Sequence, residues 1–243
     1  MLMLLGFIIL IACLVIGVRR GGIGLAAVSA IGLVFFIFVM HLKPGNPPVD
    51  VMLTIMAVVT CSAFLQASKG LDVMLKYAEK FLRSNPKYIT ILAPITTWTL
   101  AVLCGTGHVV YAMFPIIYDI AIKQNIRPER PMAVSSIASQ MGVCASPASV
   151  AVVSVVAILG ASPHPFGVMQ ILSVSIPATF IGVVIAGLWS LNRGKDLDKD
   201  EQFQAKIADP EQKAFVYGDL ADKSLVNIKL PASAYKAAII FLL

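Results

Sequence analysis

The apolar positions of the chain fall into long runs separated by short polar segments. A helix needs about 20 mostly apolar residues to cross a bilayer, with roughly 17–25 observed. Arg19 and Arg20 follow the first run where a signal peptide would need a cleavage site, so that run is expected to remain as a span. Four runs have the required length and are predicted to be membrane spans: residues 1–18, 22–40, 51–68 and 171–191.

Two further apolar segments are interrupted at their centres. Residues 89–123 are too long for one ordinary span, and cationic residues on both flanks predict that both ends lie in the cytoplasm. We therefore expect a helical hairpin that turns inside the bilayer at residues 105–108. Residues 132–160 contain Pro147 near their centre, and proline removes a backbone donor and clashes with the preceding helical turn. This segment is predicted to cross once, as a broken helix.

Lysine and arginine near the span ends set the expected orientation, because cytoplasmic loops are enriched in them. Arg19 and Arg20 place the first connection inside, and the basic residues of segment 69–88 return the chain to that side. The N-terminus is then predicted to be periplasmic, with residues 41–50 and 161–170 outside.

Three segments lie outside these spans. Residues 71–83 place apolar side chains three or four positions apart among charged ones, which predicts an amphipathic helix in the cytoplasmic interface. Residues 192–237 are polar and of mixed charge, as is typical of a solvated cytoplasmic linker. Residues 238–243 are apolar but, at about 1.5 Å per residue, far too short to cross, so they are expected to begin a truncated span. The predicted fold class is an all-α membrane protein, a polytopic bundle of helices.

Composition and charge exclude several functional classes. The 243 residues are 58% hydrophobic and 13% charged, whereas soluble domains carry roughly 25% charged residues. The net charge of +6 is spread over short runs, without the basic patch that nucleic-acid binding requires. The four cysteines stand singly in apolar stretches, so no metal site is predicted. Motifs of metalloproteases, serine hydrolases and phosphate loops are absent, so we expect neither an enzyme nor a cofactor.

The two interrupted segments supply the candidate substrate-binding site. Irregular backbone at membrane depth is tolerated only where protein covers it or where it lines a polar cavity. Many transporters bind substrate at such breaks, because helix N-termini attract anions. The alternative is that both breaks serve packing alone, as a glycine-kinked hairpin and a proline-kinked helix. The candidate substrate-binding residues are Gly105, Thr106, Gly107, His108, Ser146, Pro147 and Ser149.

Asp119 is the one acid deep within an apolar run, and intramembrane ionisable residues are functional candidates. It follows His108 by eleven residues, about 16 Å along a straight helix, which excludes a direct pair there. One hypothesis is a proton relay between His108 and Asp119. The other is an interfacial ion pair of Asp119 with Lys123.

Several stretches resemble the anaerobic C4-dicarboxylate transporter (Dcu) family, and the resemblance covers essentially the whole chain. Residues 194–200 (GKDLDKD) are similar to its DcuB-like branch. The other stretches that carry the resemblance are residues 43–51 (KPGNPPVDV), 83–88 (RSNPKY), 104–111 (CGTGHVVY) and 125–131 (NIRPERP).

The resemblance implies antiport of fumarate, malate or aspartate against succinate across the bacterial inner membrane, serving anaerobic respiration. It also implies one inverted repeat of an ion-transporter-superfamily fold, in which each repeat has a re-entrant hairpin and a broken helix. Family members are about twice as long, so the chain is expected to be an N-terminal half whose partners are the missing C-terminal repeat, the lipid bilayer and C4-dicarboxylate anions. A homo-oligomer is a further partner to test. The alternative function is a non-transporting structural or sensory membrane partner.

Overall fold

The computed structural model describes residues 2–20, 22–43, 49–160, 166–217 and 228–242. All regular secondary structure in these ranges is helical, which confirms the predicted all-α class. The chain divides into two compact units, Met1–Pro48 and Val49–Leu243. The predicted outer loops and linker include residues 44–48, 161–165 and 218–227, which lie outside the described ranges.

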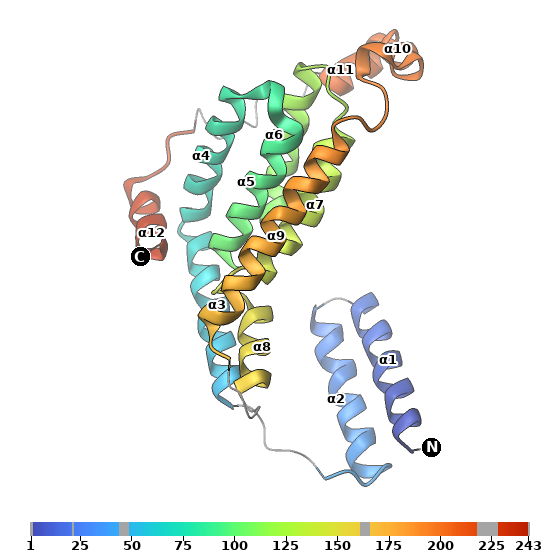
Figure 1. The fold of residues 1–243 in the computed structure, drawn as a ribbon, viewed down its shortest axis with the longest axis vertical. Helices are drawn as coiled ribbons and strands as arrows, with labels where there is room; N and C mark the ends of the chain where they lie inside the picture. Colours follow the sequence, from blue (N-terminus) through green and yellow to red (C-terminus); the bar gives the residue numbers. More distant parts are fainter. Residues whose placement is uncertain (1, 21, 44–48, 161–165, 218–227, 243) are drawn as a thin grey trace. The chain divides into compact units, whose positions relative to one another are not determined.

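The first unit is a pair of apolar helices, α1 (Leu2–Arg20) and α2 (Gly22–Phe38), that pack against each other as an antiparallel hairpin (Figure 1). Small residues allow α1 and α2 to approach each other closely. A β-carbon on Gly17 would lie 2.7 Å from Leu25 Cδ1, and one on Gly32 would lie 3.0 Å from Cys13 Sγ. Most of the remaining apolar side chains are exposed, as expected of helices that meet lipid.

The second unit contains the two interrupted segments. The hairpin segment is helical on both sides of residues 105–108, and the broken segment on both sides of residues 145–149. Its helices are α3 (Val49–Ala67), α4 (Gly70–Ser84), α5 (Ile89–Cys104), α6 (Val109–Lys123), α7 (Glu129–Cys144), α8 (Val150–Gly160), α9 (Val168–Ser190), α10 (Glu201–Ile207), α11 (Pro210–Tyr217) and α12 (Ala232–Leu242), with short 3-10 turns at Pro86–Tyr88 and Leu197–Lys199.

Three helices of the described chain are long and apolar enough to cross a membrane by themselves: Met3–Arg20, Pro86–Cys104 and Val168–Ser190. A fourth crossing arises if the pair Met52–Ala67 and Gly70–Ser84, bent by 69°, forms one span. Several apolar helices therefore occur in one chain, which agrees with a multi-pass membrane protein. The depth of the α5–α6 turn in a bilayer stays a prediction.

The segment predicted as an interfacial amphipathic helix is α4. Its apolar face is buried against protein, because Met74, Leu75 and Leu82 belong to the same hydrophobic core as residues of α5, α6 and α12. Lys69 has a left-handed backbone, φ 59°, at the bend between α3 and α4. The helix is thus a member of the bundle.

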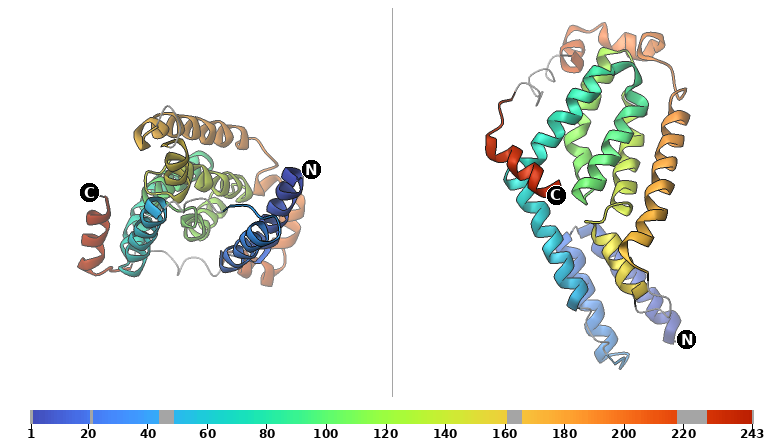
Figure 2. Two further views of the ribbon diagram at one scale, coloured as in Figure 1. Left: turned by 90° about the horizontal axis from the view of Figure 1, so that it is seen from below. Right: turned by 60° about the vertical axis from the view of Figure 1, so that its left-hand side comes forward.

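Helices α5, α7 and α9 form the packed centre of the second unit and run side by side (Figures 1 and 2). Gly142 of α7 makes the closest approach, since a β-carbon there would lie 2.7 Å from both Ala101 Cβ and the Trp98 carbonyl oxygen of α5. Trp98 Nε1 donates a hydrogen bond to Thr179 Oγ1 of α9 at 3.2 Å. These contacts hold α5, the first half of the hairpin, against both α7 and α9.

The polar segment after α9 is attached to the start of α7 and to the loop between α6 and α7. The Arg130 guanidinium donates to the carbonyls of Arg193 and Gly194 and to Asp196 Oδ1 at 2.7 Å. Leu197 N donates to the Asn125 carbonyl oxygen at 3.1 Å.

The last helix starts earlier than the apolar pattern predicts. Helix α12 begins at Ala232, within the segment predicted as linker, rather than at residue 238. The reason is local, because Pro231 is suited to a helix start and the following residues are mostly strong helix formers. Ala234 and Ala238 pack into the core beside α4.

Candidate functional site

The first break is a tight turn at the tip of the α5–α6 hairpin. Gly105 ends α5 with a left-handed backbone, φ 69°, and its N–H donates to the Ala101 carbonyl oxygen at 2.9 Å. The N–H of His108 donates to Thr106 Oγ1 at 3.3 Å, just before α6 begins. Glycine readily adopts the left-handed conformation, which explains why the helix stops at this position.

The second break separates α7 from α8, and its two serines stabilise it locally. Ser149 Oγ accepts from Val152 N at 3.2 Å and so caps the N-terminus of α8. Ser149 Oγ also donates to the Ser146 carbonyl oxygen at 3.1 Å, and Ser146 Oγ accepts from Ala148 N at 3.2 Å. Both serines are fully buried, whereas Pro147 is exposed. Both serine hydroxyls therefore bond to the backbone of the break and stabilise its non-helical conformation.

The two breaks lie against each other. A β-carbon on Gly105 would lie 2.5 Å from the Ala148 carbonyl oxygen, so only glycine permits this approach. Gly107 is buried under the side chain of Gln140, whose Nε2 would lie 2.6 Å from a β-carbon there. Backbone from the hairpin tip thus contacts backbone from the broken helix.

A pocket of about 320 Å³ opens where these two breaks meet α3. Gly105, Thr106 and His108 line it, whereas Gly107, Ser146 and Ser149 are buried and Pro147 is exposed. The complete lining is Val58, Val59, Ser62, Ala63 and Gln66 of α3, the three hairpin residues, and Ala148 and Val150 of the broken segment.

The sequence alone did not predict that α3 forms one wall of this pocket. Ser62 Oγ donates to the Cys104 carbonyl oxygen at 3.2 Å, which satisfies a group left free at the end of α5. Ser62 and Gln66 are four residues apart, and this spacing places both on one helix face. The spacing was available in the sequence, but nothing in it indicated that the face meets the hairpin tip.

The electrostatic character of the pocket comes from neutral donors and helix ends. Its lining residues include one ionisable side chain, the His108 imidazole, and no aspartate, glutamate, lysine or arginine. Helix α6 begins next to His108 and α8 begins at Val150, so two helix N-termini reach the pocket. Each carries a partial positive charge that favours an anion. No group of three or more His, Cys, Asp or Glu in the described residues could hold a metal ion.

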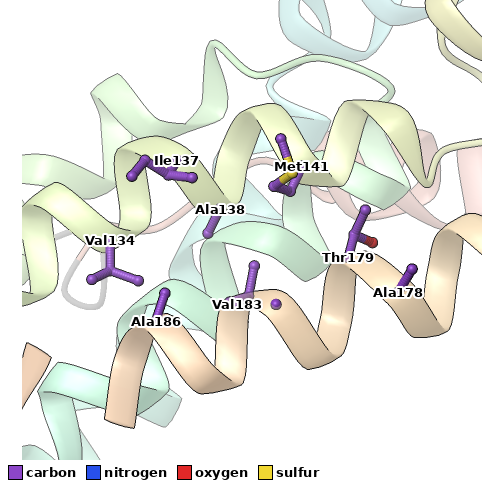
Figure 3. A pocket seen from close by; sticks show the side chains of 9 residues that line it. Val134, Ile137, Ala138, Met141, Ala178, Thr179, Val183 and Ala186 are labelled. Carbon is purple, nitrogen blue, oxygen red and sulfur yellow. The ribbon is translucent and has the colours of Figure 1, made fainter. Parts of the chain in front are cut away.

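A second cavity, of about 400 Å³, lies between α7 and α9 and is lined almost entirely by apolar side chains (Figure 3). Val134, Ile137 and Met141 face it from α7, and small residues face it from α9. The Thr179 hydroxyl there already bonds to Trp98 and to the Ser175 carbonyl. Burying a charge without partners is costly, so this groove does not suit an anionic substrate.

Asp119 is 5% exposed and forms ion pairs with two cations. Its carboxylate oxygens lie 2.7 Å from Lys123 Nζ and 2.9 Å from Arg83 Nη2. Arg83 also contacts Glu79 at 2.7 Å, so this network joins α4 to α6. The ion pair expected with Lys123 is present, and Arg83 is a further partner. The proton relay from His108 to Asp119 stays a prediction.

The sequence is similar to known membrane transporters. A family model described as anaerobic C4-dicarboxylate membrane transporter matches residues 2–243. The chain is 58% identical, over 100% of its length, to the anaerobic C4-dicarboxylate transporter DcuB of Escherichia coli and of Shigella flexneri, and covers 54% of each. It is 38% identical, over 83% of its length, to the C4-dicarboxylate transporter DcuA of Wolinella succinogenes, and covers 46% of that protein. The chain spans about half the length of these curated relatives, and no solved structure matches it.

These matches confirm the resemblance noted in the sequence. The family model covers nearly every residue, and the identity to the DcuB proteins extends along the whole chain. The chain belongs to the family of anaerobic C4-dicarboxylate membrane transporters.

Proposed function

We propose that this chain forms half of a secondary transporter that exchanges C4-dicarboxylates, such as fumarate, malate or aspartate, for succinate. The observation that carries the proposal is the pocket in which the hairpin tip, the break between α7 and α8, and α3 meet. The names of the relatives, DcuB and DcuA, describe transporters of the same substrate class.

The pocket suits a small dianion that must be bound and then released. Its volume of about 320 Å³ is at the low end of the roughly 300–1,000 Å³ found for ligand sites, which fits a four-carbon acid. Neutral donors and helix N-termini attract carboxylates without the fixed positive charge of a lysine or arginine. Moderate affinity is useful here, because a transporter has to release its substrate on the other side.

The candidate residues have different roles in this proposal. Thr106 and His108 contribute hydroxyl and imidazole donors to one carboxylate, together with the nearby start of α6. Gly105 and Gly107 bring the backbone of the tip close to the substrate and to the broken helix. Ser146 and Ser149 keep α8 separated from α7, so that its N-terminus points toward the pocket, and Pro147 prevents the two helices from merging.

In this proposal the pocket lies near the midplane of an inner membrane, and the N-terminus lies in the periplasm. The hairpin enters and leaves from the cytoplasmic side. The chain covers 54% of the DcuB relatives, and the opposite wall of the substrate cavity is assigned to the remainder of such a transporter, or to a second copy of this chain. Inverted-repeat transporters bind substrate between two repeats in this manner.

The test uses the full-length transporter that contains this chain, purified and reconstituted in succinate-loaded liposomes. External labelled fumarate should enter in a saturable way, with competition by unlabelled malate and aspartate and none by a monocarboxylate such as butyrate. Liposomes without internal succinate should accumulate less label. If the correctly inserted protein gives no exchange above protein-free liposomes, the transporter assignment is wrong and the structural or sensory alternative gains support.

A further inference from the structure

Helix α3 forms one wall of the pocket, and it carries two polar side chains there. Ser62 and Gln66 both line the cavity, whereas the other α3 residues that line it are apolar. The Gln66 carboxamide makes no hydrogen bond to the part of the chain that the structure describes, and Gln66 is exposed. A free amide at the wall of an otherwise neutral pocket is available to a ligand.

The position of this wall is set by Ser62. Its hydroxyl donates to the Cys104 carbonyl oxygen at 3.2 Å, at the last residue of α5 before the hairpin tip. Gln66 follows Ser62 by four residues, or one helical turn, on the same face. The bond therefore ties the turn of α3 that carries Gln66 to the end of α5, next to the hairpin tip.

We infer that Gln66 binds the second carboxylate of the substrate and that Ser62 positions it, so that α3 selects for the length of the dicarboxylate. The inference rests on the proposed transport function, in which the tip holds the first carboxylate. A C4-dicarboxylate carries its two charges at opposite ends, so it needs donors at two separate points of the pocket. The amide N–H₂ of Gln66 supplies donors for the far end without adding charge.

The side-chain length of residue 66 then determines which substrate fits. Gln66→Leu removes the donors at similar size and should raise the KM for fumarate and succinate by about tenfold or more, because a substrate carboxylate loses its partner. Gln66→Asn shortens the side chain by one methylene. It should raise the KM for C4-dicarboxylates and lower it for a C5-dicarboxylate such as glutarate.

Two matched controls separate these effects from general damage. Gln124→Leu makes the same substitution at an exposed position after α6, away from the pocket, and should leave both KM values unchanged. Ser62→Ala should reduce the preference for C4 over C5 acids, since the wall is no longer fixed. Ser68→Ala removes a hydroxyl just after the end of α3, where it donates to the nearby Leu65 carbonyl oxygen, and should not change that preference.

The measurement is exchange of labelled dicarboxylates by full-length transporter in liposomes, normalised to inserted protein. If wild-type protein exchanges fumarate and Gln66→Leu has an unchanged KM, the role of α3 is wrong while the transport function stands. If wild-type protein exchanges nothing, the proposed function itself fails. A Gln66→Asn variant whose KM rises by the same factor for C4- and C5-dicarboxylates would contradict the selection for length.

Discussion

The carbonyl oxygen of Ala148 lies so close to Gly105 that a β-carbon on Gly105 would stand only 2.5 Å from it. This contact joins two helix breaks that are far apart in the sequence, one at the hairpin tip and one between α7 and α8. Gly105 also has a φ of 69°, which other residues adopt only at a cost of about 1–2 kcal/mol. Both constraints apply to the same residue, so the geometry of the pocket depends on it.

Gly105→Ala should therefore separate the two breaks and abolish fumarate–succinate exchange by the full-length transporter. The backbone carbonyl of Ala148 cannot move aside as a flexible side chain could. Membrane insertion, followed by protein amount in the membrane fraction, should be unchanged. Gly182→Ala is the control, because nothing lies within 4 Å of a β-carbon there. Normal exchange by Gly105→Ala would show that the contact is dispensable.

Gly107 provides a graded comparison two residues further on. A β-carbon there would meet Gln140 Nε2 at 2.6 Å, the far end of a flexible side chain that can rotate away. Gly107→Ala should thus retain most of the exchange rate, whereas Gly107→Leu should abolish it without loss of inserted protein. Adding Gln140→Ala to Gly107→Leu should restore part of the rate. If Gly107→Leu transports normally, the tip does not belong to the site.

Thr106→Val keeps the shape of the side chain and removes its hydroxyl. If that hydroxyl bonds to a substrate carboxylate, binding should weaken by roughly 1–3 kcal/mol, since an unpaired polar partner costs about that much. Equilibrium binding of labelled succinate to purified full-length protein measures the change. Thr99→Val is the matched control, because Thr99 is exposed and its hydroxyl bonds within α5 to the Ile95 carbonyl. Equal succinate affinities of wild type and Thr106→Val would show that the Thr106 hydroxyl does not bind the substrate.

Asp119→Asn tests the ion-pair network between α4 and α6. The substitution leaves Arg83 and Lys123 without their shared carboxylate. The free energy of unfolding should therefore fall by roughly 1–3 kcal/mol, as for a lost hydrogen bond to a charged group. Thermal unfolding in detergent should show a lower midpoint. Arg83→Ala should have a non-additive effect in the double variant. Unchanged stability together with loss of fumarate–succinate exchange would favour the proton relay instead.

The orientation of the hairpin can be tested by labelling. Gln124 is exposed directly after α6, in the segment predicted to be cytoplasmic. In a full-length protein free of other cysteines, Gln124→Cys should react with an impermeant maleimide only after the cells are opened. A cysteine placed at Leu42, in a segment predicted to lie outside, should react in intact cells. Reaction of the Gln124→Cys variant in intact cells would overturn the re-entrant hairpin.

The local features of the fold could be predicted from sequence because their causes are local. Apolar runs indicate membrane helices, and glycines at 105 and 107 and Pro147 act on the backbone within a few residues of themselves. The structure accordingly has helix ends at Cys104 and Cys144. The candidate residues at the hairpin tip were also accessible in this way, since small and polar residues stand out in an apolar run.

Which of these local features meet depends on how the helices pack. The contact of Gly105 with Ala148, the ion pair of Arg83 with Asp119, and the bond of Ser62 to the Cys104 carbonyl all join residues distant in sequence. Apolar periodicity shows which face of a helix is buried but not which helix covers it, because many partners can bury the same area. The chain alone thus determined where the helices break, and the packing of α3 against the hairpin and the broken helix determined that those breaks enclose a pocket.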